Sequence, residues 1–397
     1  MSAGELPRPT LRANLRALPR AAWILFLGTF INRFGTFVMP FLVIYLTGRG
    51  HRPAQAGLAV SVYGAGHLVA AMLGGHLADR IGRRHTIALS MFSSSIAMLA
   101  LSQARTYPVI LVCAFLTGLA AELYRPAAGA LIGDLVPPEQ RITAFGVYRF
   151  AVNLGFAAGP AAAGLLASRS FLLLFVVDAI TSVLFGAIAL VALPHGIRSA
   201  AKDEEPGGAW RYALRDRRFV LFLIATACVT WIEFQIHSAL PLHVASLGFS
   251  TVTYGLLISL NGVIIVIFEL AIIGWTQRYD PQHMIAIGYF LSAIGFAMTG
   301  LAHTVPLLAM TVVIWTIGEM IYAPVTGAYV TNLAPERYRG RYQGMWVLMW
   351  SIGMVLGPSI GTLIYERKEA VLWITCAIFG VIAATLALLK PQPVDAT

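Results

Sequence analysis

The chain has 397 residues, of which 58% are hydrophobic and 12% are charged, and its formal net charge is +10. Together with a mean hydropathy of +0.75, this composition excludes an ordinary soluble protein and indicates many membrane-spanning segments. The positive charge does not imply a nucleic-acid partner, because the loops between the spans account for it.

Twelve apolar stretches are long enough to cross roughly 30 Å of hydrocarbon as helices. The sequence therefore predicts an all-α membrane protein that passes through the bilayer many times. We place the twelve spans at residues 21–46, 54–78, 86–103, 107–133, 141–168, 170–193, 219–246, 251–277, 282–303, 305–332, 339–365 and 369–389.

Lysine and arginine are concentrated in one set of loops. Because cationic loops resist translocation, we predict that both termini are cytoplasmic, in a multi-pass protein of the plasma (inner) membrane. The first apolar stretch is too long for the core of a signal peptide, so we expect it to stay uncleaved. The basic residues of the predicted cytoplasmic side include Arg8, Arg12, Arg16, Arg20, Arg80, Arg83, Arg84, Arg141, Arg211 and Arg215, whereas the other side has Arg49, Arg52, Arg105, Arg169, Arg367 and Lys368.

A short pattern of glycines and a proline occurs twice, 198 residues apart, which indicates an internal duplication. Parallel duplication of a hydrophobic unit is typical of transporters built from two like halves, with the substrate site between them. We predict two pseudo-symmetric six-helix bundles, at 1–193 and 219–397, joined by a cytoplasmic linker at 194–218. The matching positions are Gly155, Gly159 and Pro160 with Gly353, Gly357 and Pro358, and Tyr124 with Tyr322.

The loop after the second span has the most specific string of the chain, Gly-His-Leu-Ala-Asp-Arg-Ile-Gly-Arg-Arg. Glycine suits a short turn between helices, and the charged residues can bond helix ends and neighbouring charges. The string resembles the signature of the major facilitator superfamily between its second and third helices. The resemblance implies that Asp79 and Arg83 latch the two halves at a cytoplasmic gate, with Asp134 as their partner. The predicted gate residues are Gly75, Asp79, Arg80, Gly82, Arg83 and Asp134.

The fifth span resembles the motif that this superfamily associates with antiporters, through Gly155, Gly159 and Pro160. Small residues four apart let helices approach closely, and proline disturbs the local hydrogen-bond ladder, so we expect a hinge or a tight seam. The family's basic residue early in the fourth helix has no counterpart between Val112 and Thr117. A proton mechanism that depends on that residue is therefore in doubt.

Charged residues within the spans indicate function, because each costs about 2.5–3.5 kcal/mol at a helix centre unless it is paired or hydrated. Glu122 and Arg125 share a face of the fourth span by their spacing, and they form either a proton-carrying site or a structural ion pair. By the same rule Arg149 and Asn153 share a face of the fifth span, and Glu233 and His237 share a face of the seventh. Arg33, Asp178 and Glu269 lie on other spans.

Glu319 has no basic neighbour in the sequence, and Trp315 and Tyr322 flank it at helical spacing. An acid in such a setting favours its neutral form, so we expect it to bind a proton when no cation is present. Aromatic faces beside an acid also attract lipophilic cations. The string from Gly318 to Pro324 resembles the tenth helix of proton-driven bacterial multidrug transporters of the superfamily, including the lactococcal one, where the acid is functional.

The chain therefore resembles, over nearly its full length, a twelve-helix drug:proton antiporter of the major facilitator superfamily. The resemblance implies efflux of an amphipathic, cationic or neutral compound in exchange for protons by a monomer, without cofactor or metal. An uptake symporter, a lipid or lysolipid translocator, and a membrane receptor or scaffold remain alternatives. ATP cannot drive transport, because no phosphate-binding loop is present. We assign proton coupling to Glu319, Glu122 and Asp178, charge relay to Arg125, Arg149, Asn153, Arg33, Glu233, His237 and Glu269, and substrate binding to Trp315, Tyr322, Tyr124, Trp346 and Trp350, the last two facing either a cavity or lipid.

Overall fold

The computed structural model of the chain describes residues 15–137, 140–196, 208–335 and 338–389. Within these ranges the regular structure is helical, without strands. Twelve helical segments of this part are long and apolar enough to cross a membrane. The predicted fold class is thereby confirmed. The centre of the predicted linker, residues 197–207, lies outside the described residues, so the proposed linker is described only at its two ends.

The first six spans are built from eight helices, because the first and the fourth span are each formed by two consecutive helices. The break in the first span falls at Gly35, and the break in the fourth at Leu123. The helices are α2 (Arg20–Phe34), α3 (Val38–Gly48), α4 (Pro53–Ile81), α5 (Arg83–Gln103), α6 (Tyr107–Glu122), α7 (Tyr124–Leu135), α8 (Arg141–Arg169) and α9 (Phe171–Ala192).

The last six spans follow a short helix, α10. The seventh span departs from the prediction of one continuous helix over 219–246, because a 3₁₀ turn, η2, separates α11 from α12. The elements are α10 (Gly208–Arg215), α11 (Arg217–Glu233), η2 (Phe234–His237), α12 (Ala239–Ser246), α13 (Thr251–Thr276), α14 (Pro281–Thr299), α15 (Val305–Leu333), α16 (Arg339–Arg367) and α17 (Glu369–Leu388).

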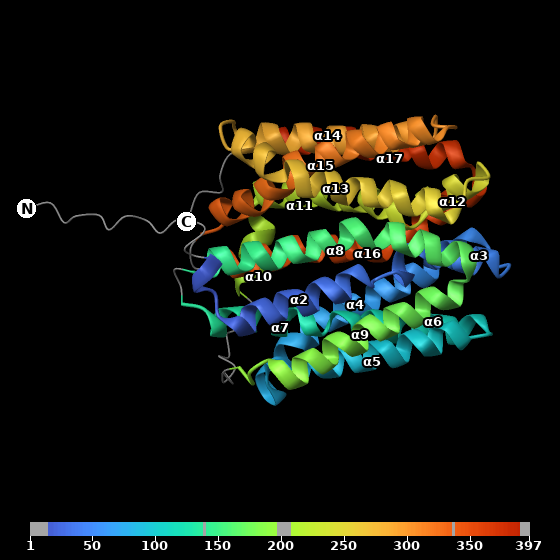
Figure 1. Cartoon of the computed structure of the whole chain (residues 1–397). Helices are drawn as coiled ribbons and strands as arrows, with labels where there is room; N and C mark the ends of the chain where they lie inside the picture. Colours follow the sequence, from blue (N-terminus) through green and yellow to red (C-terminus); the bar gives the residue numbers. More distant parts are fainter. Residues whose placement is uncertain (1–14, 138–139, 197–207, 336–337, 390–397) are drawn as a thin grey trace, which may run out of the picture.

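The helices form two bundles, α2–α9 and α11–α17, which Figure 1 shows in blue to green and in yellow to red. The bundles meet where α4 packs against α16 and where α8 packs against α13. A shift of 198 residues maps Pro53–Ile81 of α4 onto the region of α13, and Arg141–Arg169 of α8 onto α16. The two contacts are therefore equivalent under the internal duplication, as expected for two pseudo-symmetric halves.

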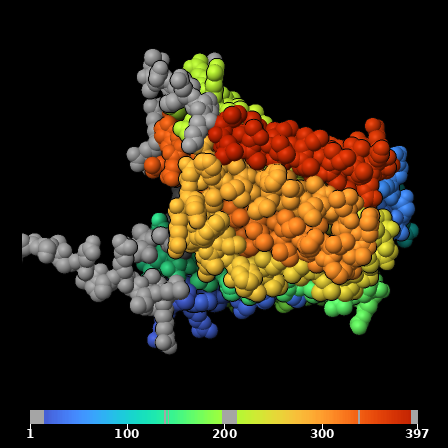
Figure 2. Space-filling view, turned by 90° about the horizontal axis from the view of Figure 1, so that it is seen from above, coloured from blue at the N-terminus to red at the C-terminus, as the bar shows by residue number. Residues whose placement is uncertain are grey.

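The outward faces of the helices are apolar. On α17, Ile374 and Ile378 lie one turn apart and are both exposed, which suits contact with acyl chains. Figure 2 shows this side of the second bundle, where α14 packs against α15 and α17. The polar groups that could carry function therefore have to be sought between the helices.

Both contacts between the halves depend on small residues that let two backbones approach. A Cβ atom at Gly255 of α13 would lie 2.3 Å from the carbonyl oxygen of Pro160 on α8. On the other contact, a Cβ atom at Gly57 of α4 would lie 2.5 Å from the carbonyl oxygen of Pro358 on α16. The predicted motif residues Gly155 and Gly159, also on α8, lie against the backbone of Phe34 at the end of α2. The glycine and proline motif is thus part of close helix packing.

Gly255→Ala is expected to push α13 away from α8, because the neighbouring atom is backbone and cannot rotate aside. Overpacking of this kind costs about 1–3 kcal/mol. Gly274→Ala on the same helix is the matched control, since no atom outside the helix lies within 4 Å of a Cβ there. Thermal unfolding of the purified protein in detergent should show a lower Tm for Gly255→Ala only. Equal Tm values for the two variants would contradict the close packing of α13 against α8 at Gly255.

The halves share one hydrophobic cluster at one end of the molecule and have separate clusters at the other. At the end formed by α3 and α12, which we call the far end, one hydrophobic cluster contains residues of both halves, among them Phe41 and Tyr254. The Tyr254 hydroxyl donates to the carbonyl oxygens of Pro40 (3.0 Å) and Ile236 (2.9 Å). At the opposite end, where α2 begins and α17 ends (Figure 1), each half has its own cluster. We call this opposite end the terminal end.

An ion pair also joins the halves at the far end. Arg52 at the start of α4 lies 2.6 Å from a carboxylate oxygen of Glu366 on α16. The other oxygen of Glu366 accepts the backbone N–H of Ala54 at 3.0 Å. Because Glu366 contacts a charged side chain and a helix N-terminus together, it holds the two halves at this end more firmly than an isolated surface pair would.

Candidate functional site

A cavity of about 500 Å³ lies between the two halves. Its volume is in the range of sites that bind small molecules. Trp346 and Trp350, one turn apart on α16, both line the cavity. Of the two orientations that the sequence left open, cavity or lipid, the structure therefore favours the cavity. The lining residues are His67 and Ala71 of α4, Glu122 at the end of α6, Arg125 and Pro126 of α7, Phe234 of η2, and Trp346, Val347, Trp350, Ser351 and Met354 of α16.

Glu122 is the centre of a charged network on the wall of this cavity. One carboxylate oxygen lies 2.9 Å from Nη2 of Arg33 and 3.0 Å from Nε2 of His67, and the other lies 3.5 Å from Nη1 of Arg125. The Glu122 side chain is only 6% exposed. The pair with Arg125 that the sequence predicts is present, but it is the longest of the three contacts. Arg33 and His67 come from α2 and α4, so only the tertiary fold brings them to Glu122.

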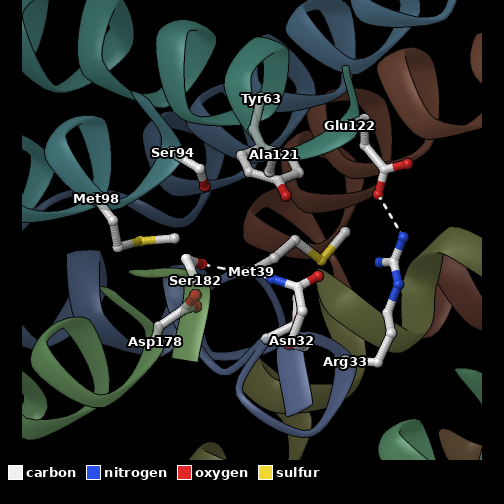
Figure 3. A pocket seen from close by; sticks show the side chains of 11 residues that line it. Asn32, Arg33, Met39, Tyr63, Ser94, Met98, Ala121, Glu122, Asp178 and Ser182 are labelled. Atoms are coloured by element: carbon white, nitrogen blue, oxygen red, sulfur yellow. Dashed lines mark hydrogen bonds and ion pairs between the residues drawn. The ribbon is translucent and has the colours of Figure 1, made fainter. Parts of the chain in front are cut away.

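Behind Glu122 is a small enclosed pocket within the first half, shown in Figure 3. Arg33 points toward Glu122 there, and the Asn32 amide donates to the Ser182 hydroxyl at 3.4 Å. Asp178 lines the same pocket. Arg33, Glu122 and Asp178, which the sequence places on the first, fourth and sixth spans, therefore lie together behind the cavity wall.

Asp178 of α9 stabilises the break between α2 and α3. Its carboxylate accepts the backbone N–H groups of Phe37 (3.1 Å) and Val38 (3.3 Å), which begin α3. The N–H of Val38 has no other acceptor among the described residues, whereas the N–H of Phe37 also donates to the carbonyl oxygen of Gly35 at 2.8 Å. A negative charge is also favourable at a helix N-terminus. At Gly35 a Cβ atom would lie 1.9 Å from Oγ1 of Thr181, so a larger residue does not fit against α9. This capping contact gives Asp178 a structural role, while its part in proton coupling stays a prediction.

Asp178→Ala should leave the N–H of Val38 without an acceptor and remove one of the two acceptors of the Phe37 N–H. Each unsatisfied buried group costs about 1–3 kcal/mol. Asp178→Asn keeps one acceptor oxygen and should lose less stability. The ranking wild type, Asn, Ala can be checked by thermal unfolding in detergent, and an Ala variant as stable as the Asn variant would argue against the capping role.

Glu233 and Glu319 form a second acidic site, in the second half. Glu233 accepts hydrogen bonds from the hydroxyls of Ser292 (2.8 Å) and Tyr322 (3.4 Å). Glu319 accepts one from the side-chain amide of Asn261 at 3.0 Å. Tyr322, which donates to Glu233, lies three residues from Glu319 on α15, so the two acids belong to the same part of the second half. Among the described residues, no arginine, lysine or histidine lies within ion-pair distance of either acid.

The aromatic residues expected to bind substrate beside Glu319 are buried inside the second half. Trp315 is 1% exposed and stacks on Phe296 with ring centroids 5.1 Å apart. Tyr322 points its hydroxyl at Glu233, and the equivalent Tyr124 of the first half packs edge-on against Phe185. None of these three is among the residues that line the cavity, so their part in substrate binding stays a prediction. Their helical spacing places them beside the acid, but on the side that faces neighbouring helices of the bundle.

The remaining predicted relay residues have separate places. Arg149 of α8 forms an ion pair with Glu269 of α13, which links the two halves. Asn153 lies one turn along α8 from Arg149 and is partly buried.

The expectation that Glu233 and His237 share a helix face is wrong, because α11 ends at Glu233 and the following 3₁₀ turn has about three residues per turn. Nδ1 of His237 is buried without a hydrogen-bond partner among the described residues.

The predicted gate residues meet at the terminal end. Arg83 Nη1 lies 2.6 Å from Asp79, and Arg83 Nε lies 3.4 Å from Asp134. Gly82, between α4 and α5, has φ +93°, a conformation that favours glycine. Arg80 is exposed, and a Cβ atom at Gly75 would touch no other atom within 4 Å. All three charged partners belong to the first half, so a latch between the halves stays a prediction.

Sequence reasoning missed His67, Asn261 and Ser292, which contact the buried acids. A histidine in the second span and an asparagine in the eighth were visible signals, because polar side chains are costly in hydrocarbon. Among the described residues, no group of three or more histidine, cysteine or acidic side chains is arranged to hold a metal ion. The chemistry that the sites offer is thus proton binding, hydrogen bonding and ionic contact.

Comparisons with known proteins agree with this architecture. The profile of the Major Facilitator Superfamily matches residues 25–276 and 237–397. The chain is 28% identical to the uncharacterized MFS-type transporter YqjV of Bacillus subtilis, over 86% of this chain and 85% of that protein. It is 26% identical to a Na(+), Li(+), K(+)/H(+) antiporter of Planococcus maritimus, over 83% and 85%, and 24% identical to the multidrug resistance protein MdtH of Citrobacter koseri, over 78% of each.

Two solved structures show the same fold. A POT family transporter in complex with 5-aminolevulinic acid superposes with a TM-score of 0.78 at 19% identity, over 93% of this chain and 95% of that chain. A bacterial homolog of the human lysosomal transporter Spinster superposes with a TM-score of 0.75 at 16% identity, over 97% of each. With the family profile matched over most of its length, the chain belongs to the major facilitator superfamily and is a multi-pass membrane transporter.

Proposed function

We propose that this protein exports amphipathic compounds across the plasma (inner) membrane in exchange for protons, by alternating access. The observation that carries the proposal is the cavity between two halves whose shared hydrophobic cluster lies at the far end. Rocking of the halves about the seams of α4 with α16 and α8 with α13 would expose this cavity to each side in turn.

The direction of transport follows from the loop charges. The arginine-rich loops predict that the terminal end faces the cytoplasm. The separate hydrophobic clusters at that end then correspond to a state that takes up its cargo from the cytoplasm. Two of the three named relatives, an antiporter and a multidrug resistance protein, support exchange and export.

We assign the proton site to Glu319 together with Glu233. Each carboxyl group is held by neutral donors, without an ion-pair partner among the described residues, and a buried acid in such a setting can bind and release a proton. Glu122 differs, because the Arg33 guanidinium at 2.9 Å stabilises its charged form. We therefore assign Glu122 a structural role in the cavity wall and no role in proton exchange.

The experiment is a flux measurement in proteoliposomes with three fluorescent probes, namely pyrenebutanoic acid, its primary amide and pyrenebutylamine. A vesicle interior more acidic than the exterior should drive uptake of at least one probe through inverted molecules, and a protonophore should abolish it. Empty liposomes correct for passive partition of the acid and the amine. Uptake that needs the opposite gradient would indicate a symporter, and the absence of gradient-dependent flux for all three probes would refute transport of this class.

A further inference from the structure

We propose that the compounds bound in the central cavity carry an anionic head group, a carboxylate or a similar oxyanion, which Arg125 binds. This inference rests on the proposed function only in taking the cavity as the substrate site. It reverses the expectation from the sequence, which pointed to cationic or neutral substrates through the acid and aromatic residues of the tenth span.

The charges on the cavity wall carry the first step. The two charged residues that line it among the described residues are Glu122 and Arg125. Glu122 already has Arg33 at 2.9 Å and His67 at 3.0 Å, and it is almost fully buried. Arg125 is 3.5 Å from Glu122, and its side chain is 55% exposed. With Arg33 neutralising Glu122, the cavity has one surplus positive charge, on Arg125.

The hydrogen-bonding groups of the wall also favour an anionic ligand. The guanidinium of Arg125 has five N–H donors and no acceptor. The ring of Trp346 lines the cavity, whereas its indole Nε1 is buried and is not open to a ligand. On the acceptor side, the Glu122 carboxylate is occupied by its three partners, which leaves the Ser351 hydroxyl. A wall whose exposed charged group is the Arg125 guanidinium complements a ligand group that only accepts, such as a carboxylate.

The two acids that we assign to proton binding do not line this cavity. Glu233 and Glu319 are absent from its wall, and each is held by neutral donors inside the second half. Proton binding and cargo binding therefore use different residues, so an anionic cargo does not have to meet the proton-binding acids directly.

The rest of the wall suits the apolar body of an amphipathic compound. Trp346, Trp350, Phe234 and Met354 supply aromatic and thioether surface next to Arg125. Such surfaces contribute non-specific affinity, whereas a bidentate contact between guanidinium and carboxylate fixes the orientation of the ligand. The cavity therefore selects for charge at one end and tolerates variation at the other.

Equilibrium binding of the three pyrene probes to the purified protein tests the proposal, with energy transfer from tryptophan to pyrene as the signal. The probes share one apolar body and differ in the head group: carboxylate, neutral amide or ammonium. A charged hydrogen-bonded contact is worth about 1.5–3 kcal/mol, so the carboxylate should bind at least about tenfold more tightly than the amide. The ammonium probe should bind more weakly than the amide.

Arg125→Gln should remove the preference for the carboxylate over the amide, and Arg125→Lys should retain part of it. Arg278→Gln is the matched control, because it removes one exposed positive charge at the terminal end of the second half without altering the cavity. Tighter binding of the ammonium probe to the wild type would overturn the proposal, as would an undiminished carboxylate preference in Arg125→Gln. If Arg125→Gln does not fold, the ranking of the three probes on the wild type decides alone.

The outcome is separable from that of the proposed function. A carboxylate preference without any gradient-driven flux would refute proton-coupled export and leave the head-group assignment intact. Gradient-driven flux of the amine alone would support export and refute the anionic head group.

Discussion

Glu319→Gln is expected to abolish the part of probe flux that depends on a proton gradient, with a loss of at least about tenfold in its rate. Glutamine preserves the size of the side chain and a hydrogen bond with Asn261, but it cannot bind and release a proton. The loss should therefore appear in coupling and not in folding. Flux in proteoliposomes with and without a protonophore measures it directly.

The control for this variant is Glu319→Asp, which keeps a titratable group and should recover part of the gradient-driven flux. Probe binding to Glu319→Gln should persist, because Glu319 does not line the central cavity. Normal gradient-driven flux in correctly folded Glu319→Gln would show that another group carries the proton, and Glu233→Gln would then be the next variant to measure.

Glu122→Leu is expected to give the largest loss of stability of the substitutions considered. It leaves the nearly buried guanidinium of Arg33 without its carboxylate partner at 2.9 Å. Removal of one partner of a buried ion pair typically costs about 3–5 kcal/mol, because the remaining charge is not compensated. Thermal unfolding in detergent should show a large drop in Tm, together with a loss of monodisperse protein.

The double variant Arg33→Leu/Glu122→Leu separates the loss of a partner from the loss of an acid. Replacement of a whole buried pair by apolar residues is often close to neutral. We therefore expect the double variant to be more stable than Glu122→Leu alone. A double variant that is less stable than either single variant would mean that Glu122 and Arg33 do not act as a pair.

The arrangement of the helices could be predicted largely from the sequence. Spans of sufficient length and a repeat of 198 residues fix the number of helices and the two like halves, since both are local or periodic features. The gate residues Asp79 and Arg83 were predicted from the resemblance to the family signature, and the structure places them 2.6 Å apart. The family resemblance added Asp134, and the structure places it 3.4 Å from Arg83.

The contacts that define the sites could not be predicted, because they join residues far apart in the chain. Glu122 was paired with Arg125 by spacing, yet Arg33 and His67 approach it more closely. Asp178 was read as a proton carrier, because no sequence pattern shows that the break at Gly35 leaves backbone donors beside it. An apolar span shows that a polar residue needs a partner, but not which helix supplies it.

The aromatic residues illustrate a further limit. Spacing alone placed Trp315 next to Glu319 and suggested a substrate contact, although the ring packs inward on Phe296. The sequence does not show whether Trp346 and Trp350 face the cavity or lipid. In the structure they line the cavity. Which side of a span faces the partner half depends on the packing of α4 with α16, and a single apolar helix does not reveal it.

The exchange of a proton for cargo can be tested most directly by the release of protons on binding. The tightest-binding pyrene probe is added to the purified protein in weakly buffered solution, and the change in pH is followed with the wild type and with Glu319→Gln. We predict that the probe displaces protons from the wild type and not from Glu319→Gln, because cargo and proton compete for different states of one transporter. Saturating binding without proton release, or with proton uptake, would contradict antiport.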